Sequence, residues 1–206
     1  MRTFETLDAV AVPWDAANTD TDQIIPARFI WRARADGYGH LLFHDLRTTE
    51  SGAVRCGFVL DRPAYRGAAV LVAGANFGCG SSREAAVWTL MDAGFGVIVA
   101  PSFGDIFREN CLKQGVLPVE LPEARCAELR AALVRNPGAR LVVDLAAQTV
   151  TGPVGVNDGF GVDGFAIDPF RKMLLLAGQD DIGFTLGHAE AITGFEVEYA
   201  RVMPWL

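Results

Sequence analysis

A glycine-rich stretch that ends in two serines and an arginine contains the residues best suited to chemistry. This stretch, Asn76–Glu84, reads NFGCGSSRE and follows a short apolar run. Backbone N–H groups and the dipole at a helix start favour an anion. Glycines let a ligand approach the backbone closely, and an arginine can bind a carboxylate through two hydrogen bonds. The stretch therefore suits a small anion or a deprotonated serine, with Ser81, Ser82 and Arg83 as candidate residues.

The same residues also have a purely structural explanation. Serines before a helix are common caps, the glycines can form a tight turn, and Arg83 can pair with an acidic neighbour. The residues alone leave both explanations open. The stretch lacks the third glycine of a dinucleotide-binding fingerprint. The chain also has no G-x-x-x-x-G-K phosphate loop and no G-x-S-x-G nucleophile elbow, which weakens a serine hydrolase interpretation.

A second polar stretch lies near the N-terminus. Asn18–Pro26 reads NTDTDQIIP, and its Asp20 and Asp22 could orient an arginine or a catalytic group. A solvated turn, in which side chains bond the backbone, is the simpler explanation of the spacing alone. Nearby arginines could belong to the surface or to a substrate pocket: Arg28, Arg32, Arg34 and Arg47.

Histidine and cysteine usage argues against a metal site in this chain. Its three histidines (His40, His44, His188) favour neither a metal ligand nor a catalytic base. Its four cysteines (Cys56, Cys79, Cys111, Cys126) include no C-x-x-C pair. Zinc and iron–sulfur sites normally contain such a pair, so we expect free thiols in a reducing compartment and no bound metal.

The glycine-rich stretch lies between two expected strands. Ala68–Ala73 and Gly96–Ala100 are short apolar runs typical of buried strands. Between them we expect a helix that begins at Ser81 and runs to about Ala93. Ser81 would be its N-cap, with Glu84 completing a capping box, and Gly94 would end it. Strand, helix and strand with short connections predict a parallel βαβ unit.

The remaining pattern predicts one mixed α/β domain over residues 1–206, in which helices flank a mixed sheet. We expect a strand-rich opening segment (1–65), a βαβ core (66–121) and C-terminal helices and strands (122–206), with a linker near Asn157–Gly164. The expected later elements are helices at Ser102–Lys113, Pro122–Asn136 and Asp168–Leu176, and strands at Val116–Leu121, Leu141–Leu145 and Gln148–Val150.

Composition and charge narrow the class of partner. The chain has 206 residues, 50% of them hydrophobic, and a formal net charge of −7, so it is globular. An acidic surface disfavours nucleic acid and anionic membranes. The N-terminal residues do not resemble a signal peptide, and the apolar runs are too short to span a bilayer. We therefore expect a cytoplasmic protein.

Five stretches, taken in order, resemble one family. Asn76–Glu84 is similar to the signature of the aconitase-type swivelling domain, and Asn18–Pro26 to the opening motif of 3-isopropylmalate dehydratase small subunits. Further similarity to the bacterial type of this family occurs at Gly37–Arg47, at Ala100–Asn110 with Gly115–Pro118, and at Asp168–Lys172 with Asp180–Gly183. The resemblance covers nearly the whole chain.

The resemblance implies a swivelling β/β/α domain that docks on a larger subunit. That partner would carry a four-iron four-sulfur cluster, and this chain would bind no cofactor itself. The implied reaction isomerises 2-isopropylmalate and 3-isopropylmalate by dehydration and rehydration in leucine biosynthesis. The chain would then be active only together with the large subunit.

The resemblance also implies roles for individual residues. Ser81 would take the proton from carbon, Ser82 would assist, and Arg83 would bind a substrate carboxylate. Asp22 would support the site. Arg32 and Arg34 are further candidates for binding the substrate.

The chain departs from the family motif at three places. Ala85 stands where the motif has histidine, and Val87 stands where it has proline. Arg34-Ala35-Asp36 stands where the bacterial type has an arginine just before Gly37, so that arginine is shifted. These departures leave other functions open. The chain could be the small subunit of a related hydro-lyase, such as a homoaconitase-like, methylmalate dehydratase or specialised-metabolism enzyme. It could also be a non-catalytic anion-binding module.

Overall fold

The structure is a computed structural model that describes residues 1–49, 51–154, 161–203 and 205. A seven-stranded sheet organises it, in the order β4-β3-β2-β1-β5-β6-β7. Its parallel half comprises β1 (Thr6–Trp14), β2 (Val70–Ala73), β3 (Val97–Ala100) and β4 (Leu117–Glu120). Its antiparallel half joins β1 through β5 (Arg140–Asp144) to β6 (Thr149–Val154) and β7 (Val162–Gly164).

The predicted βαβ unit is confirmed and is repeated once. Helix α3 (Glu84–Asp92) connects β2 to β3, and α4 (Asp105–Gln114) connects β3 to β4. Both connections join parallel strands. The mixed α/β class with flanking helices is therefore confirmed.

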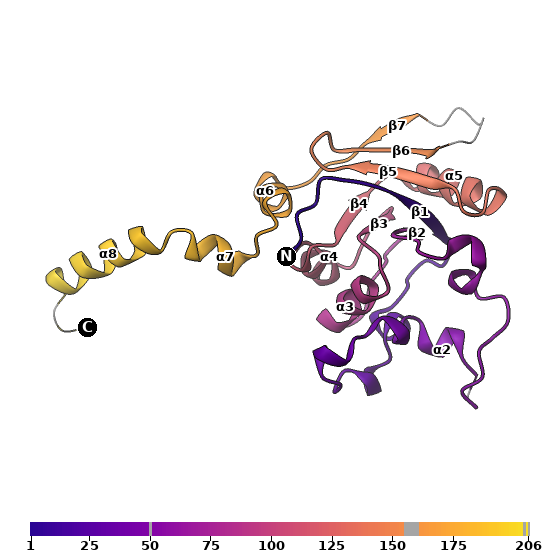
Figure 1. Cartoon of the computed structure of the whole chain (residues 1–206), viewed down its shortest axis with the longest axis horizontal. Coiled ribbons are helices and arrows are strands. Elements are labelled where there is room, and N and C mark those ends of the chain that lie inside the picture. Colours follow the sequence, from indigo (N-terminus) through magenta and orange to yellow (C-terminus); the bar gives the residue numbers. More distant parts are fainter. Residues whose placement is uncertain (50, 155–160, 204, 206) are drawn as a thin grey trace.

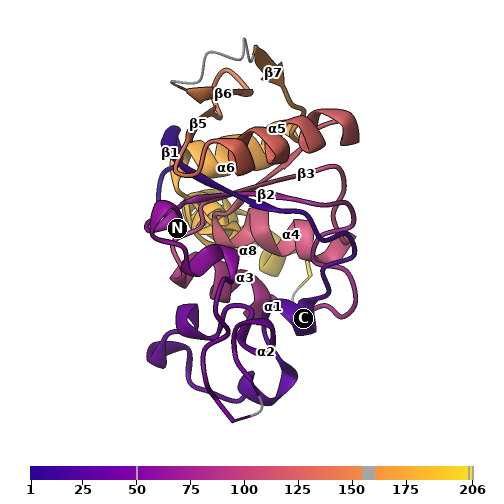
Figure 2. The same cartoon turned by 90° about the vertical axis from the view of Figure 1, so that its right-hand side faces the viewer.

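Two apolar layers cover the parallel strands because alternate side chains of a strand point to opposite faces. Leu71 and Ala73 belong to the core shared with α3 and α4. Val70 and Val72 belong to the opposite core, which includes the inner face of α5 (Glu123–Arg135). In both views α5 lies on one side of the sheet, and α3 and α4 lie on the other (Figure 1 and Figure 2).

The opening segment is built from short helical turns, so the strand-rich prediction for residues 1–65 is wrong. Only β1 is a strand of the sheet in the described part of this segment. Tyr38 and Phe43 anchor the turns because both are almost completely buried, and Phe43 stacks on Trp14 at 4.3 Å between ring centroids. The turns are α1 (Thr21–Ile24), Ala27–Phe29, Arg34–Asp36, Gly39–Leu41, α2 (His44–Arg47), Val59–Asp61 and Pro63–Tyr65.

Two helices begin later than predicted. Helix α3 begins at Glu84 with Arg83 at the N-cap and no side-chain cap, so the predicted Ser81 capping box is wrong. Helix α4 begins after Gly104, and Ser102 Oγ instead accepts a hydrogen bond from the Asn76 N–H at 2.9 Å. In both places the polar side chain before the helix belongs to a loop contact. The later helix α6 (Pro169–Ala177) does begin at the predicted Asp168 cap.

The predicted linker is wrong at its C-terminal end. Val162–Gly164 forms β7, which pairs with β6, while residues 157–160 lie outside the described part of the chain. After α6, helices α7 (Asp181–Leu186) and α8 (Ala189–Val202) extend away from the sheet (Figure 1). No helix within the described residues has the length and apolarity needed to cross a bilayer.

The buried hydroxyl of Tyr65 provides a test of how α5 is held. It donates a hydrogen bond to the Leu133 carbonyl at 3.1 Å, in the last turn of α5, where carbonyls lack helical partners. Tyr65→Phe leaves that buried carbonyl unpaired, so we expect it to lower the free energy of unfolding by about 1–2 kcal/mol. Urea unfolding measures the change. Tyr199→Phe, at a position 42% exposed on α8, is the control and should have no effect.

Candidate active site

Three loops meet where the first three parallel strands end. They follow β1 at Trp14, β2 at Ala73 and β3 at Ala100. Because parallel strands place their carboxyl ends at one edge of the sheet, the loops are neighbours, and such an edge is the usual ligand site of α/β sheets. Both polar stretches singled out in the sequence therefore lie at the same edge.

Backbone hydrogen bonds join the first two loops. The Gly78 N–H donates to the Thr19 carbonyl at 2.8 Å, and the Thr21 N–H donates to the Cys79 carbonyl at 2.9 Å. Gly80 has φ +89°, and a Cβ there would lie 2.0 Å from Asp20 Oδ2. Only glycine fits this approach, so the glycines of the stretch have a definite structural purpose.

This pairing brings Thr21 against Ser81. The Thr21 hydroxyl donates to the Ser81 carbonyl at 3.1 Å, and the two hydroxyl oxygens lie 3.4 Å apart. Thr21 is fully buried, whereas Ser81 and its neighbour Ser82 are exposed in the chain by itself. Thr21 was not among the residues predicted for the site, although it lies inside the NTDTDQIIP stretch.

Arg83 forms an ion pair with Asp22 across the same junction, from Nη1 to Oδ1. The hydrogen bond from Arg83 lowers the pKa of Asp22 below its ordinary value, outweighing the slight burial that raises it. Asp22 also accepts from the Ala27 N–H at 3.1 Å. The acidic neighbour foreseen for Arg83 is therefore Asp22. Within the described contacts the pair uses a single guanidinium nitrogen, so the other nitrogens remain able to bind a carboxylate.

The third loop brings the N-terminus of α4 to the junction. Gly104 is its N-cap, and no side chain bonds the first N–H groups. A hollow of about 310 Å³ lies between Ser81, Cys79 and residues 104–107. Uncapped N–H groups with the helix dipole favour negative charge there. The predicted start of this helix, at Ser102, lies too early by two residues, so these N–H groups are not among the predicted site groups.

The junction does not contain the groups of a hydrolase. No histidine is among the described residues that line the hollow. Cys79 lines it, but burial raises the pKa of its thiol, and nearby Asp20 raises it further. A thiolate nucleophile is therefore disfavoured at Cys79.

The structure does not bring Arg34 to Ser81. Arg34 forms a bidentate ion pair with Asp92. Its Nη1 donates to Oδ2 at 2.5 Å, and its Nη2 donates to Oδ1 at 2.8 Å. Asp92 ends α3, whose nine residues span roughly 13 Å, and Ser81 lies beyond the other end. Arg32 is exposed, with its guanidinium 5.5 Å from the Phe29 ring. Substrate contacts by Arg32 and Arg34 remain a prediction, which for Arg34 requires that it leave Asp92.

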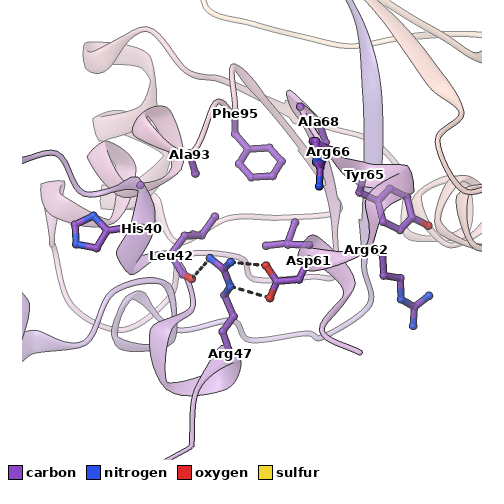
Figure 3. Close-up of a pocket in the computed structure, with 13 residues that line it drawn as sticks. His40, Leu42, Arg47, Asp61, Arg62, Tyr65, Arg66, Ala68, Ala93 and Phe95 are labelled. Atoms are coloured by element: carbon purple, nitrogen blue, oxygen red, sulfur yellow. Dashed lines mark hydrogen bonds and ion pairs between the residues drawn. The ribbon is translucent and has the colours of Figure 1, made fainter. Parts of the chain in front are cut away.

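A second hollow, of about 440 Å³, lies at the opposite edge of the sheet (Figure 3). Ala68 and Phe95 line it just before β2 and β3 begin. Arg47, another arginine noted in the sequence, forms an ion pair there with Asp61, and its Nη1 donates to the Leu42 carbonyl at 3.4 Å. Arg47 therefore helps to hold the opening segment together and lies away from Ser81.

Comparison with known proteins decides the family. The model described as aconitase C-terminal domain matches residues 1–124, and LeuD_N matches 127–169. The model for the C-terminal domain of the 3-isopropylmalate dehydratase small subunit matches 181–206. A 3-isopropylmalate dehydratase small subunit from Paramagnetospirillum magneticum is 47% identical, with both chains covered in full. The chain belongs to the family of 3-isopropylmalate dehydratase small subunits.

Further matches agree with this membership. The small subunit from Saccharophagus degradans is 46% identical over 100% of this chain and 98% of its own. A solved structure of 3-isopropylmalate dehydratase from Methanocaldococcus jannaschii superposes with a TM-score of 0.62 over 93% of this chain and 99% of its own. At 22% identity, it supports the fold alone. The predicted family of aconitase-type hydro-lyases is confirmed, and the term small subunit implies a large-subunit partner.

The described residues do not fit an iron–sulfur cluster. They include no group of three or more His, Cys, Asp or Glu side chains that could hold a metal ion. Burial raises the pKa of Cys126 to about 11 and that of Cys111 well above its ordinary value. Cluster ligands are thiolates, so we assign no cluster step to this chain.

The Arg83–Asp22 pair predicts a measurable titration. In Arg83→Met the pKa of Asp22 should rise toward the ordinary value of about 3.9, since the hydrogen bond that lowers it is lost. The depressed pKa stabilises the fold above the unfolded-state pKa, and this stabilisation disappears as the pH falls through the folded-state pKa. Arg83→Met should therefore destabilise at pH 7, and its difference from the wild type should disappear as the pH falls through the folded-state pKa of Asp22.

NMR titration of the Asp22 carboxyl carbon measures this shift. Arg34→Met is the matched control, because Arg34 pairs with Asp92 instead. An unchanged Asp22 pKa in Arg83→Met would show that the ion pair does not form in solution.

Proposed function

We propose that this chain acts with a large, cluster-bearing subunit to isomerise 2-isopropylmalate and 3-isopropylmalate by dehydration and rehydration. The observation that carries the proposal is the junction of Ser81 with the Arg83–Asp22 pair in a chain 46–47% identical to 3-isopropylmalate dehydratase small subunits. The proposal includes a place in leucine biosynthesis. The cluster in the large subunit would supply Lewis-acid chemistry at the substrate hydroxyl group.

In the proposed reaction, this chain binds the substrate and moves a proton. The free nitrogens of Arg83 would bind one substrate carboxylate, and Asp22 would hold the guanidinium in place. Ser81 Oγ, as the alkoxide, would take a proton from one carbon as the adjacent carbon loses its hydroxyl group as hydroxide. The proton and the hydroxide are together the elements of water, and a double bond remains between the two carbons. Rehydration with the positions exchanged returns the proton and gives the isomer. Ser82 would assist beside Ser81.

The exposure of Ser81 explains why the proposal requires a partner. An alkoxide in water gains little from nearby N–H groups, whereas the same groups are far more effective in a site that excludes water. Ser81 is exposed in the chain by itself. We therefore infer that this edge of the sheet is covered by the large subunit, which completes the pocket.

The departures from the family motif do not favour another substrate. Ala85 is 7% exposed and Val87 is fully buried, both in the core between α3 and the sheet. Neither lines the hollow beside Ser81. A histidine or a proline at these positions would alter packing within α3 rather than the pocket lining. The related hydro-lyases therefore remain secondary candidates.

Reconstitution tests the proposed reaction. The chain is mixed anaerobically with a cluster-loaded large subunit and assayed on 3-isopropylmalate, with the unsaturated intermediate followed by ultraviolet absorbance. We expect turnover only in the mixture. Ser81→Ala should reduce kcat at least about 100-fold, because general base catalysis commonly contributes that much, while leaving assembly intact.

Ser51→Ala, a substitution of another exposed serine, is the control and should retain full activity. Turnover by Ser81→Ala at the wild-type rate would remove Ser81 from the base role. Activity on citrate-like or methylmalate substrates alone would move the assignment to a related hydro-lyase.

The Thr21–Ser81 contact predicts a second kinetic effect. Thr21→Val keeps the shape of this buried side chain and removes its hydroxyl, so Ser81 loses both the bond to its carbonyl and the neighbouring oxygen. We expect kcat to fall about 10-fold with little change in KM, since an unheld proton-transfer group is misplaced. Thr21→Ser should restore most of the activity. A change in KM alone would assign Thr21 to substrate binding instead.

A further inference from the structure

Helix α8 has an apolar face that nothing in the described structure covers. Ile192, Phe195, Tyr199 and Val202 recur at spacings of three, four and three residues, so they form a stripe along one side of the helix. Their exposed fractions lie between 39% and 65%, and no described residue of α8 is buried. The helix extends away from the sheet beyond α7 (Figure 1).

Such a helix needs a partner. Isolated helices shorter than about 12–15 residues are marginal in water, and α8 has 14 residues. The preceding helix α7 is held against α6. Asp181 of α7 pairs with Arg171 of α6 at 2.8 Å, and Phe184 packs edge-on against Phe170 at 5.1 Å between ring centroids. The stripe itself lies beyond these contacts.

Charge and length narrow the choice of partner. Three glutamates and one arginine lie on α8 (Glu190, Glu196, Glu198 and Arg201), whereas helices that bind membrane surfaces are rich in lysine and arginine. A coiled coil with a second copy normally needs at least three or four heptads, and α8 offers about two. An apolar groove flanked by basic residues fits the helix best.

The family comparisons indicate which protein has that groove. The general aconitase C-terminal domain model ends at residue 124, whereas the model specific to these small subunits spans 181–206, which includes α7 and α8. The arm formed by α7 and α8 therefore lies in the part matched by the small-subunit model and not by the general domain. A separate small subunit must hold its large subunit without a covalent link, and an added amphipathic helix provides such a hold.

We infer that the stripe Ile192–Phe195–Tyr199–Val202 docks in an apolar, basic-flanked groove of the large subunit. This inference rests on the proposed function, since it needs the same partner. It assigns to α8 a role in assembly that is separate from the chemistry at Ser81. Phe195 and Tyr199 are the expected anchors, because aromatic side chains contribute most to interfaces of this kind.

The test compares two faces of the same helix. Phe195→Asp combined with Tyr199→Asp places charge on the stripe, whereas Val197→Asp places it on the opposite face, where Val197 is 68% exposed. The dissociation constant for the large subunit is measured by titrating activity under anaerobic conditions. We expect the stripe variant to bind at least about 10-fold more weakly, with kcat at saturation unchanged. Val197→Asp should bind like the wild type.

Two controls separate the outcomes. Thermal unfolding of each isolated chain should be unchanged, because the substituted side chains are exposed, and size-exclusion chromatography reports self-association. If the wild type binds the large subunit and the stripe variant binds equally well, the inference is wrong and the proposed function stands. If the stripe variant only dissociates a dimer of this chain, the inference is also wrong. If the wild type fails to bind, the proposed function fails as well.

Discussion

The close approach of three loop backbones is the constraint on which the candidate site depends. A Cβ on Gly78 would lie 2.2 Å from the ring of Phe107, and a Cβ on Gly104 would lie 2.6 Å from the Gly78 carbonyl oxygen. A Cβ on Gly74 would likewise lie 2.6 Å from the Ala16 carbonyl oxygen. No side chain fits at these positions, so glycine alone allows the loops after β1, β2 and β3 to close on one another. The site residues and the start of α4 are neighbours as a result.

Because the three loops lie so close together, many of their polar groups bond one another, and other donors at the same edge remain available to a ligand. The Asn76 amide donates to Asn18 Oδ1 at 2.8 Å, and Asp20 accepts from the Asp22 N–H at 2.6 Å. These bonds satisfy the loops internally and fix their shape. The Ser82 hydroxyl, the remaining guanidinium nitrogens beside it and the first N–H groups of α4 are left for a ligand. A preorganised set of donors of this kind costs little to bind a dianion.

The sequence predicts the sheet core well because buried parallel strands appear as short apolar runs, and both Val70–Ala73 and Val97–Ala100 are completely buried. Features that depend on distant partners are predicted less well. Ser81 has the residue type of a cap, but its carbonyl accepts a bond from Thr21 sixty residues away. The strand prediction fails for the opening segment because packing against Trp14 and α3 fixes that segment, rather than hydrogen bonding to a neighbouring strand. Tertiary contacts of this kind override local preference, and no local pattern reveals them.

The two surfaces attributed to the partner are connected through one side chain. Arg171 of α6 forms an ion pair with Asp181, the first residue of α7, at 2.8 Å. It forms a second ion pair with Glu109 of α4 at 3.5 Å. The N-terminus of α4 lines the hollow beside Ser81. A large subunit bound at α8, as we propose, would thereby be linked through α6 and α4 to the edge that we propose it covers. Binding to the folded chain would stabilise both contacts together, so assembly and completion of the pocket would occur as a single event.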